Sequence, residues 1–316
     1  MKKFALIIIV LLNFVFSSNA QEIELEKFLD KAYQATLEYR ETFKNLVAEE
    51  LRTYDYFRKD ESLKDSRKIK SIFIVYQSPK NNSIAEYRNV IEFNGKNVAR
   101  SDEGVIKFVE KLAKSDSSSE EFERLRKEAN RFDGKSHAYG LTLGQGVPLQ
   151  PFYRPFFEFQ IVGKEKIEGR EVVVVEYKQT KVTLRIKVNA TDEELKQEPS
   201  GTSYDTFLPN NFRPTNPRVH GKLWLDAETG QIWRDEYNVT IQPTILSKPV
   251  VAFAFLFHYQ SGEFRILTPN KFLIRFYRFS GKGEADLKVS KVSQNLIEYT
   301  KFIKLKTEAK EAKTEK

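Results

Sequence analysis

The sequence predicts an α+β fold, in which one large curved antiparallel sheet is covered by helices. The second half of the chain is an almost continuous series of short strands separated by turn residues. Several of these strands are apolar on both faces, so each face of the sheet needs cover. Two amphipathic segments in the first half supply helices that satisfy one side of that requirement.

The first 20 residues have the pattern of a secretory signal peptide. Lys2 and Lys3 form a positively charged start, an apolar run follows, and Ser18 to Ala20 offer small residues for cleavage. The alternative is a membrane anchor, but the run is shorter than the ~20 apolar residues that span a bilayer. We therefore expect cleavage after Ala20 and a periplasmic or secreted mature protein.

Composition narrows the class of protein further. The chain has no cysteine, which excludes disulfides and a lipid-modified N-terminal cysteine. Its formal net charge is +8, with basic residues scattered among acidic ones. Such a surface is typical of a soluble exported protein, and we expect no nucleic-acid partner.

Residues 24–46 are predicted to form one amphipathic helix that packs against the concave face of the sheet. Apolar side chains recur there at steps of three and four residues, with charges between them. The following residues, up to Phe57, mark the entry into a strand. The apolar positions of the helix are Leu25, Phe28, Leu29, Ala32, Ala35, Tyr39, Phe43 and Leu46.

The rest of the first half contains two strands and a helical insertion. Residues 71–78 are apolar on both faces and 85–93 alternate, after which Asn94-Gly95 gives a strong hairpin signal. Residues 102–132 show helical apolar stripes and are expected near the open edge of the sheet. A glycine-bearing loop around 140–151 then divides the two halves of the chain.

The second half is predicted to be nearly all strand. Turn residues punctuate it, among them Glu168-Gly169 and the segment from Asp226 to Gly230. Residues 21–306 are expected to form a single domain, followed by a charged, disordered tail at 307–316. The predicted strands are 156–167, 171–177, 181–188, 219–226, 231–241, 250–259, 271–279 and 287–305.

No catalytic, metal or cofactor signature stands out. His137, His220 and His258 lie in different segments without metal-ligand spacing. The best catalytic alternative is a hydrolase with paired carboxylates, using residue types such as Asp226, Glu228, Asp235 and Glu236. Against it, the first two are turn residues, and the adjacent second pair points to opposite faces of one strand.

Two aromatic strands provide the candidate binding residues. Period-two alternation places apolar side chains of 250–259 on one face, and a similar set follows on 271–279. We predict that these side chains line a cavity for an acyl chain or similar lipid, although aromatic stripes on strands often fill an ordinary core. The predicted cavity-lining residues are Phe253, Phe255, Phe257, Phe272, Ile274 and Phe276.

The order of signal, amphipathic helix and antiparallel strands resembles the periplasmic lipoprotein-carrier group of LolA-, LolB- and RseB-like proteins. The hairpin that carries Asp226, Thr229 and Gly230 is the closest local match. The stretches "LVAEELR" and "EYRNVIEFNGKNV" also resemble a set of uncharacterised exported bacterial proteins. The carrier resemblance implies a half-barrel plugged by helices, with an apolar interior that receives acyl chains. The chain departs from that group in its greater length and in lacking the cysteine of a LolB-like anchored acceptor.

These features together predict a non-catalytic carrier of a lipid or a lipoprotein acyl chain, without a cofactor. Two alternatives stay open. One is an interaction protein for envelope stress that contacts a membrane-associated partner, as the resemblance to RseB implies. The other is the periplasmic hydrolase with paired carboxylates.

Overall fold

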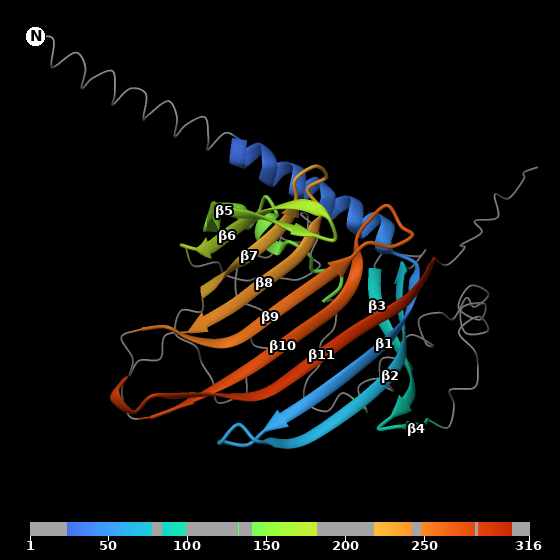
Figure 1. Ribbon diagram of the computed structural model, residues 1–316, viewed down its shortest axis with the longest axis vertical. Helices are drawn as coiled ribbons and strands as arrows, with labels where there is room; N and C mark the ends of the chain where they lie inside the picture. The colour runs from blue at the N-terminus through green and yellow to red at the C-terminus, as the bar shows by residue number, and fades with distance from the viewer. Residues whose placement is uncertain are drawn as a thin grey trace, which may run out of the picture.

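All strands that the structure describes belong to one open antiparallel sheet (Figure 1). The computed structural model describes residues 24–77, 84–98, 132, 141–181, 218–241, 248–281 and 284–304. Across the sheet the order is β4-β3-β2-β1-β11-β10-β9-β8-β7-β6-β5. The strand bounds are β1 Leu46–Phe57, β2 Leu63–Gln77, β3 Ile84–Phe93, β4 Lys96–Asn97, β5 Phe157–Ile167, β6 Arg170–Gln179, β7 Arg218–Asp226, β8 Ile232–Ile241, β9 Val250–Gln260, β10 Thr268–Ser280 and β11 Lys288–Lys304.

The sheet is strongly curved, which confirms the predicted fold class. Figure 1 shows β3 and β4 turned away from the plane of β7 to β11. Consecutive strands pair with each other except β4 and β5, which lie at opposite edges, and the last strand, β11, pairs with β1 as well as with β10. Two antiparallel meanders are thereby joined into a single half-barrel with free edges at β4 and β5.

A helix at 24–43 runs along one end of the sheet, as the sequence predicts (Figure 1). Its Tyr39 ring lies 6.0 Å from that of Tyr259 in β9, and its Phe43 ring lies 5.9 Å from that of Phe302 in β11. We call the sheet face that bears this helix the inner face. Because the helix leads directly into β1 and also contacts β9 and β11, it spans the junction between the two meanders.

The helix ends at residue 43, three residues earlier than the predicted end at 46. Asn45 has a φ of 59°, and its side-chain oxygen accepts a hydrogen bond of 3.1 Å from the backbone N–H of Gln77. A left-handed residue stops a helix because the chain can no longer continue its turn. Leu46 is buried, as its place in the apolar stripe required, but it is the first residue of β1.

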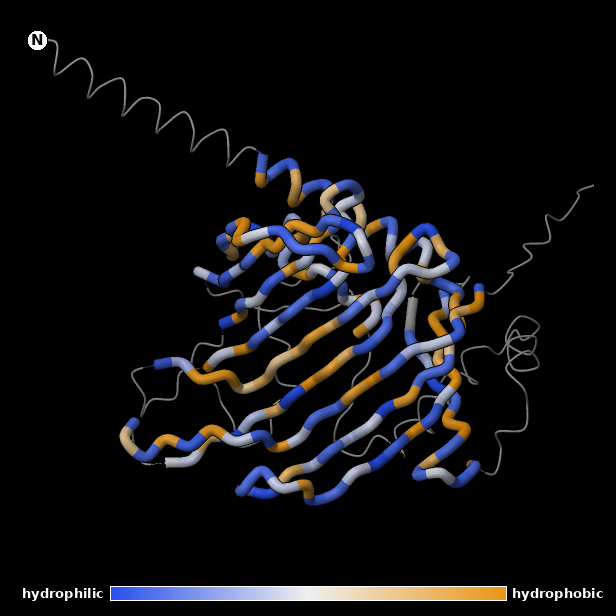
Figure 2. Tube along the Cα trace, in the orientation of Figure 1, coloured by the Kyte–Doolittle hydropathy of each residue, from blue (hydrophilic) through white to orange (hydrophobic). Residues whose placement is uncertain are grey.

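The strand predicted at 71–78 is the second half of a longer one. β2 begins at Leu63, and residues 63–68, which pair with the end of β1, are mostly exposed and charged. Figure 2 shows the hairpin between β1 and β2 as largely hydrophilic. Sequence periodicity does not detect such residues, because a strand that is exposed to solvent on both faces has no alternation of apolar and polar side chains.

Several predicted segments lie outside the described residues. These are the signal peptide, the strand at 181–188 apart from its first residue, the C-terminal tail, and the insertion at 102–132 apart from its last residue. That last residue, Phe132, is helical, and its ring lies 5.4 Å from that of Phe93 at the end of β3.

The loop between the two halves is a core element of the structure. Nearly every residue of 141–150 is buried, including the short 3-10 helix η1, Val147–Leu149. The hydroxyl of Tyr39 donates a 2.8 Å hydrogen bond to the carbonyl of Thr142. A second 3-10 helix, η2 (Arg154–Phe156), leads into β5, and Arg154 forms an ion pair with Asp30 of the helix. Helix 24–43 and this segment together cover one end of the inner face.

The turn between β7 and β8 fixes the helix to the sheet. One carboxylate oxygen of Asp226 accepts backbone hydrogen bonds from Glu228 at 2.9 Å and Thr229 at 2.8 Å. Gly230 closes the turn with a φ of 78°. A Cβ atom on this glycine would lie 3.1 Å from the backbone of Ala32 in the helix. Only glycine meets both demands, a left-handed backbone and a close helix.

We expect Gly230→Ala to destabilise the protein more than Gly169→Ala does. Both glycines have positive φ, at 78° and 81°, but a Cβ at Gly169 would meet nothing within 4 Å. The control therefore measures backbone strain alone, about 1 kcal/mol. Urea unfolding should show an additional loss of about 1–3 kcal/mol for Gly230→Ala, from overpacking against the helix. Equal losses for the two variants would contradict the close packing.

Candidate functional site on the inner face

The six residues predicted to line a cavity lie together on the inner face, in three directly opposed pairs. Strand register sets Phe257 opposite Phe272, Phe255 opposite Ile274, and Phe253 opposite Phe276. The ring centroids of the first pair are 4.7 Å apart and those of the last pair 5.7 Å apart, both with edge-to-face geometry. Pairs of this kind stabilise a sheet beyond the apolar area that they bury. We call these six residues the aromatic band.

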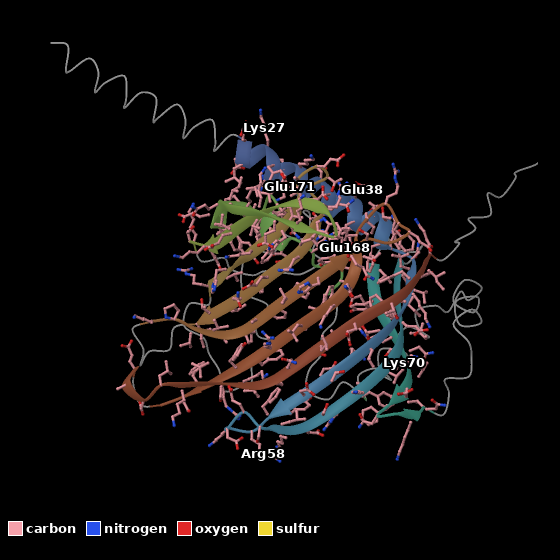
Figure 3. The ribbon with its side chains drawn as sticks, in the orientation of Figure 1. Lys27, Glu38, Arg58, Lys70, Glu168 and Glu171 are labelled. Carbon is pink, nitrogen blue, oxygen red and sulfur yellow. The ribbon has the colours of Figure 1, made fainter. Side chains whose placement is uncertain are left out.

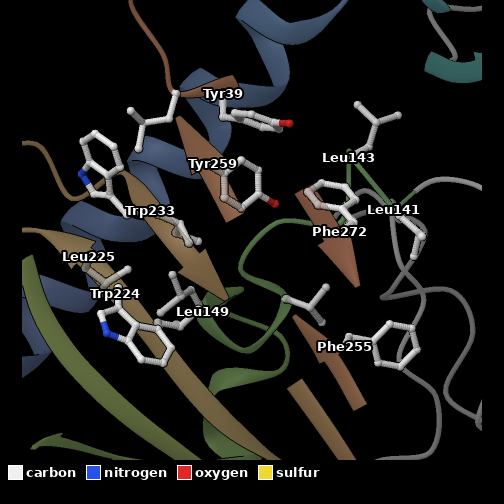
Figure 4. Close-up of a cluster of buried hydrophobic side chains, with 14 of the residues drawn as sticks. Tyr39, Leu141, Leu143, Leu149, Trp224, Leu225, Trp233, Phe255, Tyr259 and Phe272 are labelled. Atoms are coloured by element: carbon white, nitrogen blue, oxygen red, sulfur yellow. The ribbon is translucent and has the colours of Figure 1, made fainter. Parts of the chain in front are cut away.

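The aromatic band is continuous with the core under the helix. Phe272 is fully buried, and its ring lies 5.7 Å from that of Tyr259, which in turn contacts the helix through Tyr39. Figure 4 shows Phe255 and Phe272 in the buried cluster with Tyr39 and Leu149. Phe257 and Phe276 are only partly buried. Phe272 therefore joins the band to the core under the helix, Phe257 and Phe276 stay partly accessible, and a cavity beside the band stays a prediction.

A buried ionic network lies beside the aromatic band on the inner face of β1 and β3. The Arg88 Nε atom donates to both carboxylate oxygens of Glu50 at 2.9 Å, and its Nη2 lies 3.3 Å from Glu86. Arg52 Nε lies 3.0 Å from the same Glu50 carboxylate. Glu86 also accepts hydrogen bonds from the backbone N–H and hydroxyl of Thr142, at 2.8 and 2.6 Å. Two acidic and two basic side chains thus balance one another and hold the buried loop.

Burial and the neighbouring charges have opposite effects on the pKa of Arg88 in this network. Burial by itself lowers the pKa of Arg88, but the neighbouring Glu50 and Glu86 raise it well above its usual value, so the guanidinium stays charged. Its cation lies 5.1 Å from the centre of the Phe73 ring. Nearby, burial raises the pKa of the Tyr39 hydroxyl, and the Glu86 charge adds to that rise. Such a network is costly to desolvate, and removing one of its members would leave a buried charge without its partner.

Sequence analysis did not single out these charges. The signal that could have found them is the strand period: Glu50, Arg52 and Tyr54 share the face of β1 that also carries buried Ala48. Charges placed on the apolar side of an alternating strand indicate a buried polar site.

Asp235 is a second buried charge on the inner face, directly opposite Phe257 of the aromatic band. It is 4% exposed, accepts a hydrogen bond from the Gly146 backbone, and lies 3.4 Å from the Tyr177 hydroxyl. Burial raises the pKa of Asp235 to about 7, an effect that these hydrogen bonds only partly offset. The adjacent Glu236 is half-buried and accepts a hydrogen bond from Asn238. The two carboxyls point to opposite faces, as predicted, and do not form a catalytic pair.

The other two carboxylates of the hydrolase hypothesis support the β7–β8 turn. Arg170 bridges them, with Nε 3.1 Å from Asp226 and Nη2 3.0 Å from Glu228. Burial alone would raise the pKa of Asp226, but hydrogen bonds from Arg170, Thr229 and Trp233 lower it to about 2. An acid with so low a pKa is a poor proton donor near neutral pH. Its role here is structural.

Within the part of the chain that the structure describes, no cluster of histidine, cysteine or acidic residues has the arrangement of a metal site. Burial lowers the pKa of both His220 and His258, which lie on different strands. His137 lies outside the described residues. A search of the described helices for one long and apolar enough to cross a bilayer found none.

Comparison with known proteins gives likenesses of fold only. No family model matches the sequence, and no curated protein matches it. An outer membrane lipoprotein-sorting protein domain from Vibrio parahaemolyticus is 10% identical, with a TM-score of 0.35, over 88% of this chain and 92% of that one. A LolA superfamily protein from Nitrosomonas europaea is 8% identical, with a TM-score of 0.29, over 87% and 91%. The MucA/MucB complex of Pseudomonas aeruginosa gives 8% identity and a TM-score of 0.21, over 87% and 93%.

The structures that this chain resembles therefore include members of the lipoprotein-carrier group, in agreement with the resemblance seen in the sequence. Because the TM-scores lie below 0.5 and the identities do not exceed 10%, these likenesses carry no argument about what this chain binds.

We expect the stability of the protein to fall with rising pH through Asp235, and Asp235→Asn to remove that fall. A carboxyl whose pKa rises from 3.8 to about 7 on folding binds its proton more tightly in the folded state. Its contribution is therefore lost as the pH increases from about 4 to 7. Urea unfolding at pH 5 and pH 8 should show the wild type losing about 3 kcal/mol relative to Asp235→Asn. Glu236→Gln, on the opposite face, is the control, and an identical pH dependence in Asp235→Asn would contradict the assignment.

We expect Arg88→Met to be severely destabilising and Arg67→Met to be mild. Removing Arg88 leaves two buried carboxylates facing each other without their shared cation, which should cost about 3–5 kcal/mol. Arg67 pairs with Asp65 at the exposed end of β2, where both side chains are more than 40% exposed. That exposed pair should contribute less than about 1 kcal/mol. Comparable losses of unfolding free energy for the two variants, measured by chemical denaturation, would show that the buried network stabilises the protein no more than the exposed pair does.

Proposed function

We propose that this is an exported, non-catalytic binding protein for a lipid or a lipoprotein acyl chain, which lies on the inner face beside the aromatic band. The observation that carries the proposal is the alignment of six large apolar side chains in three directly opposed pairs on that face. Period-two alternation could have left the two strands in any register, but the pairing observed makes one continuous apolar surface across them.

The energetics of an acyl chain suit such a surface. Each methylene group removed from water contributes about 0.8 kcal/mol, so a long chain needs no specific polar contact to bind. Phe257 and Phe276 are partly exposed while Phe253 and Phe255 are buried, at 3% and 7% exposure. The band therefore combines a fixed wall with side chains that are open to contact. Because aromatic side chains are more rigid than methionine side chains, a surface built from them loses less conformational entropy when a ligand binds.

A second candidate function is interaction with a protein partner of the cell envelope. It is favoured by the edge strand β5 and the segment before it, where Phe152, Ile161 and Val162 are 37%, 39% and 44% exposed. An edge strand offers unpaired backbone groups, and exposed apolar side chains beside it are suited to bind a partner by strand addition. Co-purification from envelope fractions would support this role, and loss of the partner after Ile161→Lys would place it at β5.

We expect the double variant Phe255→Ala/Ile274→Ala to bind a fluorescent fatty acid at least 10-fold more weakly than the wild type. These two side chains face each other at the centre of the aromatic band, and their removal takes apolar contact from the ligand. The matched control is Leu256→Ala/Leu273→Ala, which removes the neighbouring pair on the outer face of the same two strands. Circular dichroism should verify that both doubles are folded.

If the double variant unfolds, the partly exposed Phe276 replaces it in the test, as the single change Phe276→Ala. Native mass spectrometry of the protein purified from its own periplasm supplies an independent measurement. A clean apo mass together with no uptake of the fatty acid by the wild type would leave the proposal without support. Undiminished binding by both band variants would place the ligand elsewhere.

A further inference from the structure

Three buried polar groups lie on the inner face, one on β2 among the residues of the ionic network and two on β11 between that network and the aromatic band. They are the hydroxyl of Ser71, the side-chain oxygen of Asn295 and the hydroxyl of Tyr299, whose residues are 0%, 3% and 1% exposed. None of these atoms has a hydrogen-bond partner among the residues that the structure describes. A buried polar atom left in that state costs about 1–3 kcal/mol. Three such atoms on one face indicate a site that is completed by something else.

Strand register places the three groups on the same face of the sheet, on β2 and β11, which flank β1. Glu50 of β1 lies directly opposite Ser71 on one side and Tyr299 on the other. Asn295 lies four residues before Tyr299 on the same face of β11, with buried Ile297 between them, and it is directly opposite Ile274 of the aromatic band. The Tyr299 ring also contacts Phe272 of the band, with 5.4 Å between centroids. The apolar surface and the polar groups therefore form one uninterrupted stretch of the inner face.

Charge selects the kind of group that this place accepts. Glu50 and Glu86 are paired with Arg52 and Arg88 at distances of 2.9 to 3.3 Å, so the network has no excess charge. Burying a phosphate or a free carboxylate here would add an uncompensated charge in a place shielded from water, at a cost of several kcal/mol. Burial, together with the charge of Glu50, raises the pKa of Tyr299 well above its usual value, so its hydroxyl stays protonated and able to donate.

We infer that the ligand is an amphiphile with an uncharged, hydrogen-bonding head, of the class of an acylglycerol, whose ester or hydroxyl groups meet Ser71, Asn295 and Tyr299 while its chain lies on the aromatic band. Hydroxyl and ester oxygens match this set, since Ser71 and Tyr299 can donate and the Asn295 oxygen can accept. The inference rests on the proposed acyl-chain function and adds the selection of the head group.

The test compares three ligands that share one oleoyl chain and differ only in the head: monooleoylglycerol, oleate and oleoyl lysophosphatidic acid. Wild-type protein should bind monooleoylglycerol at least 10-fold more tightly than either charged ligand at pH 7.5 in a competition assay. Asn295→Ala, and separately Tyr299→Phe, should reduce that preference by 5-fold or more. Oleate binding should change little, because the band is intact.

Gln294→Ala is the matched control, since Gln294 precedes Asn295 on β11 and bonds to Arg275 on the outer face. A preference that persists in Asn295→Ala and Tyr299→Phe, or that never existed in the wild type, overturns the inference while leaving acyl-chain binding intact. A change in melting temperature without a change in head-group preference also overturns it, because it would mean that ordered water satisfies these groups. Failure of all three ligands to bind overturns both this inference and the proposed function.

Discussion

The pairing of the last strand with the first is the interaction on which the rest of the structure depends. β11 lies between β10 and β1, and in the sheet that the structure describes it is the strand that joins the meander of β1 to β4 to that of β5 to β10. The ionic network belongs to the first meander and the aromatic band to the second. Tyr299 of β11 lies opposite Glu50 of the network and contacts Phe272 of the band, and Asn295 lies opposite Ile274 of the band. Without this strand the two parts of the candidate site would not share a face.

The way in which the inner face is covered follows from that topology. Helix 24–43 directly precedes β1, so it starts beside the junction and reaches across it to Tyr259 of β9. The buried segment 141–150 fills the space beneath, where Thr142 bonds both to the helix and to Glu86 of the network. Figure 3 shows that the labelled charged side chains, such as Lys27 and Glu38 on the helix and Arg58 on the β1–β2 hairpin, project from the periphery. The four charged side chains of the ionic network, on β1 and β3, are by contrast buried.

Much of the architecture could be predicted because alternation and turn residues are local signals. The apolar period gives β6 to β10 to within a few residues, and Asp226 to Gly230 gives the hairpin between β7 and β8. The grouping of Phe253, Phe255 and Phe257 with Phe272, Ile274 and Phe276 also follows from two alternating strands that happen to be neighbours. The face and spacing of these residues needed no knowledge of distant contacts.

The remainder depends on long-range pairing, which periodicity does not encode. The solvent-exposed beginning of β2 is a strand only because β1 pairs with it. Segment 141–150 is buried only because the helix and β3 enclose it. Glu50, Arg52 and Arg88 look like ordinary surface charges until β1 and β3 are known to present them to the same interior. A sequence-based analysis finds such residues when it asks which face of a strand each charge occupies.

The position of β11 has a consequence for the integrity of the molecule. Its Lys301 pairs with Glu49 of β1 across 252 residues of chain, a far greater separation than in any hairpin. A cut that removes β11 would do more than shorten the sheet by one strand. It would divide the half-barrel into two smaller sheets, and each would carry a newly bared edge, at β1 and at β10. Long bare edges with apolar neighbours are templates for self-association. Proteolysis at this end of the chain would therefore leave one chain with two smaller sheets, each with an aggregation-prone edge.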